Sequence, residues 1–182
     1  PLAPGKIAAA GKLPTDSVMT CRAADQWSDS EILSFVGARK PATVGFTLYM
    51  WNVERSMWLA GQIRRLVPEA FILGGGPEVT GDNLWLRESR VFDLLVEGEG
   101  EPFALRIGET GFLRDAAGRR GGFLSTGRCS FLPDEWPDPY FTGHMESASD
   151  LPAHLETVRG CPHGCAYCSY RRICPKPREI PA

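Results

Sequence analysis

The stretch Thr43-Val-Gly-Phe-Thr-Leu-Tyr49 decides the fold class of this chain. It is rich in β-branched and aromatic residues and lacks a clean alternation of apolar and polar positions, which is typical of a strand buried on both faces of a parallel sheet. Residues 52–66 follow, with apolar side chains at every third or fourth position, and they predict an amphipathic helix. Asn52 is a favourable N-cap residue for this helix, and Pro68 ends it.

The same order of strand and helix recurs along the next forty residues. A second apolar run at 70–73 precedes a weaker helix near 83–88, and a third run at 91–96 precedes a helix predicted for 102–107. Strands and helices that alternate at this spacing imply right-handed βαβ crossovers and a parallel sheet. We therefore expect residues 1–110 to form an α/β domain, a flavodoxin-like or Rossmann-like open sheet whose usual first strand is missing.

Before this pattern the signals are shorter. We expect the end of a helix over residues 7–12, a short outer strand over 17–20 and a helix over 31–37.

Residues 111–152 are predicted to form a hairpin followed by a linker. The glycine-rich run 118–122 favours a turn, with residues 112–113 and 123–124 as the arms of the hairpin. Residues 131–140 carry three prolines and several aromatic side chains, and they indicate an ordered linker.

Composition excludes several classes of protein. The 182 residues have a formal net charge of −2, 43% apolar residues and 23% charged residues, which is ordinary for a soluble globular protein. No apolar run approaches the roughly 18 residues of a membrane-spanning helix, and no basic block suggests nucleic acid as a partner. Six cysteines without a visible secretory signal argue against a disulfide framework and favour the cytoplasm.

Three cysteines lie close together near the end of the chain. Cys161, Cys165 and Cys168 have the spacing C-x-x-x-C-x-x-C on a loop that contains two glycines. A 4Fe–4S cluster normally takes four thiolates, one for each iron. Three thiolates at this spacing would leave one iron with an open position, and there the cluster could do chemistry rather than only carry electrons.

A structural zinc site is the alternative for the same cysteines. Cys165 and Cys168 form one C-x-x-C pair, and Cys161 with either Cys174 or His163 could complete a tetrahedron. A second C-x-x-C pair, which structural zinc sites usually have, does not occur in the sequence.

A second candidate site follows the predicted strands. Ligands of open α/β sheets bind outside the carboxyl ends of the strands. The run Gly74-Gly-Gly-Pro-Glu78 follows one strand, and its glycines would let the backbone approach a large ligand. Residues 47–52 follow the preceding strand and supply a hydroxyl, two aromatic rings and an amide. Neither segment contains a nucleotide-binding fingerprint, and tight turns without a ligand are the alternative.

The cysteine spacing, with Tyr167 just before the third cysteine, resembles the radical S-adenosylmethionine (SAM) superfamily. The resemblance implies that Cys161, Cys165 and Cys168 hold a 4Fe–4S cluster whose unique iron is chelated by SAM. An electron from such a cluster cleaves SAM to a 5′-deoxyadenosyl radical.

The order of the other motifs is similar to that of the cobalamin-binding radical SAM proteins. The first motif is a strand that ends near Tyr-x-Trp-Asn, and it is followed by Gly-Gly-Pro-Glu and then by Gly-Glu-Gly-Glu. The cysteine loop comes about sixty residues after the last of these. The resemblance covers residues 43–101 and 155–170, and it implies an N-terminal domain that cradles cobalamin. The cofactor-binding residues that it implies are Thr47, Leu48 and Tyr49 along the corrin with Asn52 beside them, Gly74, Gly75, Gly76, Pro77 and Glu78 along the nucleotide tail, Glu99 and Glu101 near the cleft between domains, and Tyr167 beside the cluster.

Residues 153–182 are expected to begin a truncated (β/α) barrel, with residues 154–158 as its first strand. The resemblance implies a fragment of a radical SAM enzyme that transfers a methyl group, or makes another radical modification, on a small-molecule or natural-product substrate. It also implies an electron donor such as flavodoxin or ferredoxin. The residues that would contact the substrate are not assigned. The alternative functions are a binding module for cobalamin or a partner, without chemistry of its own, and a zinc-stapled structural domain.

One motif of other cobalamin proteins is absent. The D-x-H-x-x-G sequence that supplies a lower axial histidine does not occur, and the three histidines, His144, His154 and His163, lie in other contexts. We expect that cobalt, if it binds here, lacks a lower histidine ligand.

Overall fold

The computed structural model describes residues 2–15, 26–107, 109, 111–118, 121–127, 136–145, 153–168, 174 and 176–179. The chain divides into two compact units. Unit 1 comprises residues 1–20, 99–109 and 126–182, and unit 2 comprises residues 21–98 and 110–125. The strand predicted for residues 17–20 lies outside the described residues.

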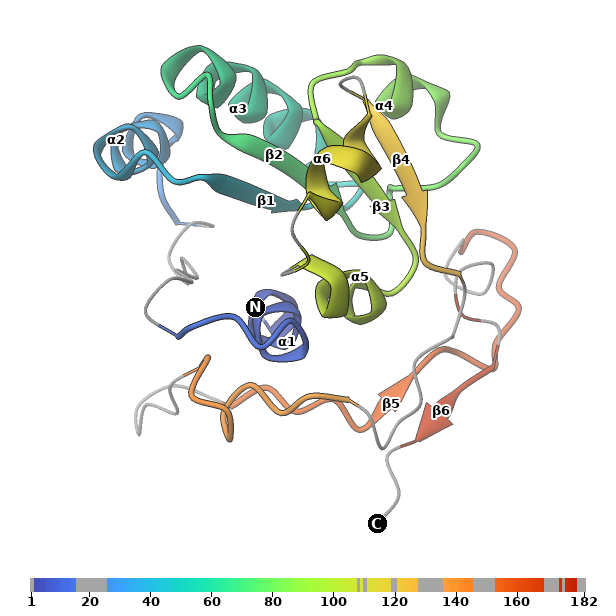
Figure 1. The fold of residues 1–182 in the computed structure, drawn as a ribbon. Helices are drawn as coiled ribbons and strands as arrows, with labels where there is room; N and C mark the ends of the chain where they lie inside the picture. The colour runs from blue at the N-terminus through green and yellow to red at the C-terminus, as the bar shows by residue number, and fades with distance from the viewer. Residues whose placement is uncertain are drawn as a thin grey trace. The chain divides into compact units, whose positions relative to one another are not determined.

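Unit 2 contains a four-stranded sheet (Figure 1). Its strands are β1 (Thr43–Thr47), β2 (Phe71–Gly75), β3 (Leu94–Glu97) and β4 (Gly122–Ser125), in the order β1-β2-β3-β4. All three neighbouring pairs are parallel. The predicted α/β class with an open parallel sheet is therefore confirmed.

The helices of unit 2 are α2 (Asp29–Arg39), α3 (Val53–Leu66), α4 (Leu84–Glu88) and α6 (Phe112–Ala117). The first three correspond to the helices predicted over residues 31–37, 52–66 and 83–88. Helix α2 begins with a capping box, because the Ser28 hydroxyl accepts from the Glu31 N–H and the Glu31 carboxylate accepts from the Ser28 N–H.

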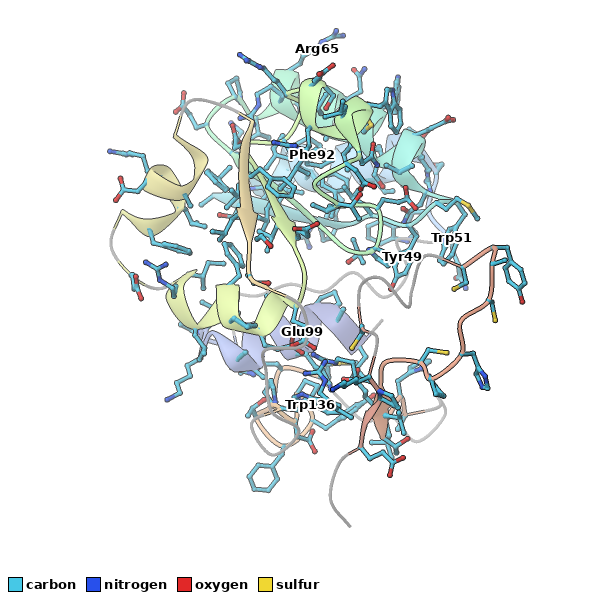
Figure 2. The ribbon with its side chains drawn as sticks, turned by 90° about the vertical axis from the view of Figure 1, so that its right-hand side faces the viewer. Tyr49, Trp51, Arg65, Phe92, Glu99 and Trp136 are labelled. Carbon is cyan, nitrogen blue, oxygen red and sulfur yellow. The ribbon has the colours of Figure 1, made fainter. Side chains whose placement is uncertain are left out.

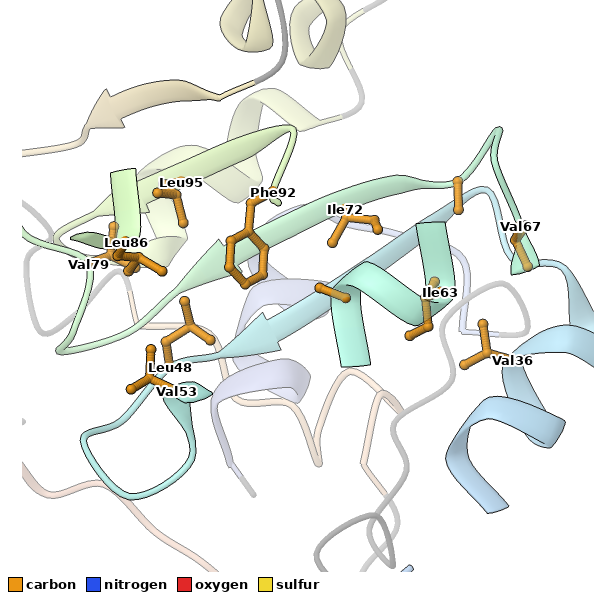
Figure 3. Close-up of a cluster of buried hydrophobic side chains, with 12 residues drawn as sticks. Val36, Leu48, Val53, Ile63, Val67, Ile72, Val79, Leu86, Phe92 and Leu95 are labelled. Atoms are coloured by element: carbon orange, nitrogen blue, oxygen red, sulfur yellow. The ribbon is translucent and has the colours of Figure 1, made fainter. Parts of the chain in front are cut away.

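The core of unit 2 joins the sheet to the helices (Figure 3). Ala60 and Ile63 of α3 pack with Ile72 of β2 and with Phe92, which precedes β3. The Phe92 ring meets the Phe46 ring edge-on, with 5.9 Å between centroids.

Burial on both faces holds for Leu94, Leu95 and Val96 of β3 but not for β1. The expectation that β1 is buried on both faces is wrong, because β1 is the first strand in the order β1-β2-β3-β4 and its residues Thr43 and Gly45 are exposed.

The predicted hairpin is wrong. Residues 112–117 form helix α6, and residues 122–125 form β4, which pairs in parallel with β3. Gly118 ends α6 with a positive φ of 56°, and the N–H groups of Gly121 and Gly122 both donate to the carbonyl of Asp93. The sheet thus extends past residue 110, where the sequence pattern predicts the domain to end.

Unit 1 contains α1 (Leu2–Ala10), α5 (Gly100–Ile107), β5 (Val158–Arg159) and β6 (Arg178–Glu179). Helices α1 and α5 pack closely, since a Cβ atom at Gly11 would lie 2.9 Å from the carbonyl oxygen of Ala104. The strand predicted for residues 154–158 is wrong in most of its length, because residues 154–157 have no regular structure and β5 is limited to Val158–Arg159, which pairs antiparallel with β6. The start of a barrel stays a prediction.

The part of the chain that the structure describes contains no helix long and apolar enough to cross a membrane.

Candidate functional site

The first candidate site is the carboxyl edge of the sheet in unit 2, where β1 and β2 end side by side. Thr47 lies opposite Gly75 in the register of these two strands. The backbone N–H of Leu48 continues the pairing with a 2.6 Å hydrogen bond to the Gly75 carbonyl. The segments 47–52 and 74–78, which the sequence singles out, therefore lie together at one edge.

Asn52 fixes the turn after β1 in a way that the sequence pattern does not predict. It occupies the N-cap position of α3, but its side chain makes no capping hydrogen bond with the helix. Instead, Oδ1 accepts from the Tyr49 N–H at 2.8 Å, and Nδ2 donates to the Thr47 carbonyl at 3.0 Å. The prediction of a capping side chain is thus corrected, because the amide folds back onto the turn.

This turn presents an aromatic pair at the sheet edge (Figure 2). The rings of Tyr49 and Trp51 stack with 4.5 Å between centroids and an interplanar angle of 11°. Trp51 is 76% exposed, and its neighbour Met50 is 78% exposed. Trp51 is absent from the cofactor-binding residues that the family resemblance implies, and only the turn geometry places it beside Tyr49.

The three glycines differ in what they allow. A Cβ atom at Gly74 would lie 2.8 Å from Cδ2 of Leu95 in the core, and one at Gly76 would lie 2.7 Å from the carbonyl oxygen of Leu48. Gly76 also has a φ of +112°, which side chains rarely adopt. At Gly75 the nearest atom would be 3.8 Å away. Gly76 is therefore required by the backbone itself, and Gly74 lies where buried side chains leave little room for a Cβ atom, whereas Gly75 is under neither constraint.

Leu48 is fully buried in the core, with a relative exposure of 0%. Of the three residues expected along a corrin ring, only Thr47 and Tyr49 therefore have partly exposed side chains. Any contact of Leu48 with a ligand would be made by its backbone.

The loop after β2 is held by its own hydrogen bonds. Pro77 and Glu78 are partly exposed, and the Glu78 carbonyl accepts from Nδ2 of Asn83 at 3.0 Å. The Gly81 N–H donates to the Glu97 carboxylate at 2.9 Å, which ties this loop to the end of β3. The edge is thus a preformed surface rather than a loose loop.

The second candidate site is the cysteine loop of unit 1. Cys161, Cys165 and Cys168 are free thiols, and both Cys165 and Cys168 are exposed. Tyr167 between them is 93% exposed. Among the described residues, no three metal-binding side chains are already assembled around one point. The donor set, three thiols, suits an iron–sulfur cluster or zinc by its chemistry.

Cys174 lies beside this loop but is buried, with 4% exposure. Its carbonyl accepts from the Cys161 N–H at 3.4 Å, and its thiol contacts the Arg178 guanidinium at 3.4 Å and the Lys176 carbonyl at 3.8 Å. The thiol of Cys174 is therefore engaged inside unit 1, whereas those of Cys165 and Cys168 are exposed.

Glu99 and Glu101 contact arginines of the cysteine-loop region. Arg159 donates to Glu99 at 3.2 Å and to Glu101 at 2.6 Å, and Arg178 donates to Glu99. Glu156 completes the group through hydrogen bonds from Arg159 and Lys6. The Trp136 ring lies against these cations, and its centroid is 4.5 Å from the guanidinium carbon of Arg159. Glu99 and Trp136 are both labelled in Figure 2.

The charges of this group stabilise one another. Burial alone would lower the pKa of Arg159, but hydrogen bonds to Glu156 and Glu101 outweigh it and raise that pKa. Burial alone would raise the pKa of Glu156, but hydrogen bonds from Arg159 and Lys6 bring it below its ordinary value. Both shifts favour the charged forms of Arg159 and Glu156.

Two of the three histidines, His144 and His154, lie outside both sites, whereas His163 belongs to the cysteine loop, between Cys161 and Cys165. His144 is half-buried, with Nε2 2.7 Å from the Leu13 carbonyl and Nδ1 2.9 Å from the Thr142 hydroxyl. His154 and His163 are exposed.

Three curated proteins are similar in sequence. The cobalamin-dependent radical SAM methyltransferase TokK of Streptomyces tokunonensis is 29% identical over 74% of this chain and 23% of its own length. The 2-(S-pantetheinyl)-carbapenam-3-carboxylate methyltransferase of Streptantibioticus cattleyicolor is 32% identical over 74% of this chain and 23% of its own. The hopanoid C-3 methylase of Methylococcus capsulatus is 28% identical over 78% of this chain and 30% of its own. No protein-family model matches.

These similarities confirm the resemblance carried by the motifs: the chain is a relative of the cobalamin-binding radical SAM proteins. It spans between 23% and 30% of the length of these three relatives.

Proposed function

We propose that this chain supplies the cobalamin-binding edge and the cluster-binding loop of a radical SAM methyltransferase. The observation that carries the proposal is the set of three free thiols at C-x-x-x-C-x-x-C spacing in a chain related to such an enzyme. When bound, a 4Fe–4S cluster would supply the electron that cleaves SAM, and cobalamin would carry the methyl group.

Cys161, Cys165 and Cys168 would ligate three irons and leave the fourth for SAM. The exposure of Cys165 and Cys168 supports this role, because both thiols can reach an incoming cluster without unfolding the unit. Tyr167, which is also exposed, would cover one side of the cluster. The engaged thiol of Cys174 argues against a fourth cysteine ligand.

Thr47, Tyr49, Trp51 and the backbone of Gly75 would contact cobalamin. The stacked pair of Tyr49 and Trp51 offers a flat apolar face, and Gly75 leaves the backbone accessible at the adjacent strand end. Asn52 would act by holding this turn in shape. Pro77 and Glu78 would border the nucleotide tail.

The substrate class is inferred from the relatives, and the compartment and the electron donor are inferred from the chemistry of the cluster. A small-molecule substrate is favoured because the relatives include a methyltransferase named for a carbapenam carboxylate. Because such clusters are oxygen-labile, we place the protein in the cytoplasm, with a flavodoxin or ferredoxin as electron donor. In this proposal the substrate is held by parts of the enzyme outside residues 1–182.

Metal analysis after anaerobic reconstitution with iron and sulfide tests the proposal against its alternatives. Iron and acid-labile sulfide in equal amounts, with bound hydroxocobalamin after desalting, are the expected results. Zinc that resists displacement by iron would favour a structural zinc domain. Retention of cobalamin without any cluster would favour the alternative that the chain is a binding module without chemistry of its own.

A further inference from the structure

The short ribbon of β5 and β6 closes the base of the cysteine loop. Residues 160–177 run between these two strands, and Arg159 of β5 is directly opposite Arg178 of β6. Like charges at opposite positions of an antiparallel pair repel each other. This neck of the loop therefore needs a compensating anion to stay closed.

Glu99 supplies that anion. Its carboxylate accepts from Arg159 Nη1 at 3.2 Å and from Arg178 Nη1 at 3.3 Å, with a further contact to Arg178 Nη2. The exposed fractions of the side chains are 10% for Glu99, 12% for Arg159 and 14% for Arg178. Glu101 and Glu156 also accept from Arg159, but Glu99 contacts both arginines of the neck. Because the three side chains are largely desolvated, losing this carboxylate costs more than losing one at the surface.

The neck controls where the cysteines lie. Cys161 follows Arg159 by two residues, and its N–H bonds to the carbonyl of Cys174. The Cys174 thiol is held by Arg178 at 3.4 Å. Gly160 adopts a φ of +106°, and a Cβ atom there would lie 2.6 Å from the Lys176 carbonyl oxygen, so the two sides of the neck touch.

We propose that Glu99 is a positioning residue that clamps the neck of the cysteine loop. By bridging Arg159 and Arg178 it holds Cys161 in place for a cluster shared with Cys165 and Cys168, and it keeps the Cys174 thiol out of the ligand set. The part of this proposal that concerns the cluster rests on the proposed function. The clamp itself does not, and it also acts in the metal-free protein.

Glu99→Gln tests the clamp, because the amide keeps the size of the side chain and removes its charge. In metal-free protein, maleimide labelling followed by peptide mass spectrometry reports each cysteine separately. In the unchanged protein Cys174 should react far more slowly than Cys165 and Cys168. In the variant we expect Cys174 to react at least about tenfold faster, as local opening of a buried segment becomes easier.

Two controls separate this opening from general unfolding. Asp29→Asn makes the same chemical change in the exposed pair of Asp29 with Arg55, whose side chains are 43% and 41% exposed, and it should leave Cys174 protected. Hydrogen exchange of the amides in β1 to β3 should be the same in both variants, because the sheet is part of unit 2. Glu99→Asp should restore part of the protection.

The iron content and the EPR spectrum of the reconstituted proteins complete the test. We expect Glu99→Gln to bind less than half as much iron and to show altered g values in the cluster that remains, since a displaced Cys161 or a recruited Cys174 changes the ligand field. Unchanged Cys174 protection in Glu99→Gln would overturn the clamp. Faster labelling in a protein that never binds a cluster would uphold the clamp and refute the proposed function.

Discussion

The carboxylate of Asp93 receives a hydrogen bond from the guanidinium of Arg64, which joins the start of β3 to the last turn of α3. The same carboxylate accepts from the Ile72 N–H at 2.7 Å, and Arg64 also donates to the Ala70 carbonyl at 2.7 Å. Asp93 is only 7% exposed. One ion pair therefore satisfies several backbone groups at the amino edge of the sheet.

We expect Asp93→Ala to lower the free energy of unfolding by about 3–5 kcal/mol, because it leaves the Arg64 charge and the Ile72 N–H without their acceptor. Urea unfolding followed by circular dichroism measures this. Arg55→Ala, which removes an exposed pair, should cost no more than about 1 kcal/mol. A loss for Asp93→Ala as small as that of the control would show that the pair is not structural.

Cys161→Ala, Cys165→Ala and Cys168→Ala should each abolish the EPR signal of the reduced cluster after anaerobic reconstitution, since each removes one of three ligands. Cys21→Ala and Cys129→Ala should leave the signal intact. The buried thiol of Cys174 predicts that Cys174→Ala also retains a cluster. Loss of the signal at Cys129 or Cys174 equal to that at Cys161 would mean a different ligand set.

A Cβ atom at Gly75 has room, because the nearest atom would be 3.8 Å away. Gly75→Leu adds three further carbon atoms at this half-buried strand end, so urea unfolding of the variant is measured beside its cobalamin retention. If the nucleotide tail of cobalamin lies along this strand end, the leucine side chain would overlap with it, and the close-packed strand cannot move aside. We therefore expect Gly75→Leu to weaken cobalamin retention by at least about tenfold. The visible spectrum of desalted protein reports the bound cobalamin.

Two further variants interpret that result. Arg65→Ala, an exposed change on α3 far from Tyr49 in Figure 2, should retain cobalamin fully. Gly76→Ala should destabilise the fold itself through its positive φ and its contact with Leu48. Full retention by Gly75→Leu would remove the glycine run from the proposed site.

The pKa of Glu156 lies below the ordinary value of 4.5 in the folded state, because hydrogen bonds from Arg159 and Lys6 outweigh the effect of burial. A carboxyl whose pKa is lowered by folding contributes stability above its unfolded pKa, and that contribution is lost as the pH falls through the folded pKa. The groups that face Glu156 are the cations of Lys6 and Arg159, and Arg159 is shared with Glu101.

Unit 1 should therefore unfold at a lower temperature at pH 3 than at pH 7, and Glu156→Gln should reduce this difference. Thermal unfolding followed by the fluorescence of Trp136, which lies against the same cations, measures it in a background where the four tryptophans of unit 2 are replaced by Phe. An identical pH dependence in Glu156→Gln and the unchanged protein would assign the effect to other carboxyls.

Bound cob(II)alamin should show no superhyperfine splitting from a nitrogen ligand in its EPR spectrum. His144 is engaged by Leu13 and Thr142, and no histidine lies in the D-x-H-x-x-G context. A nitrogen-split signal that disappears in His144→Ala would contradict this prediction and identify the ligand.

Local patterns predicted most of the regular structure of unit 2. The apolar runs at 70–73 and 91–96 lie in or just before β2 and β3, and the periodic residues 52–66 contain α3, because strand burial and helix amphipathicity leave signals within a few residues. The hairpin prediction was wrong because the pairing of β4 depends on a distant part of the chain. Residues 122–125 join β3, a partner far away in sequence, and nothing in their own composition distinguishes a parallel edge strand from a hairpin arm.

The sequence by itself determined the α/β class, the three thiols and their spacing, and the family resemblance, because residue identity and short-range spacing are properties of the chain. Only the tertiary structure decided what individual residues do. It showed that Gly74 and Gly76 serve packing and backbone geometry, that Asn52 folds back to lock a turn, and that Glu99 bridges Arg159 and Arg178. Such roles depend on contacts between residues as many as 79 positions apart, and the free energy of a buried charge or a close contact is set by those partners.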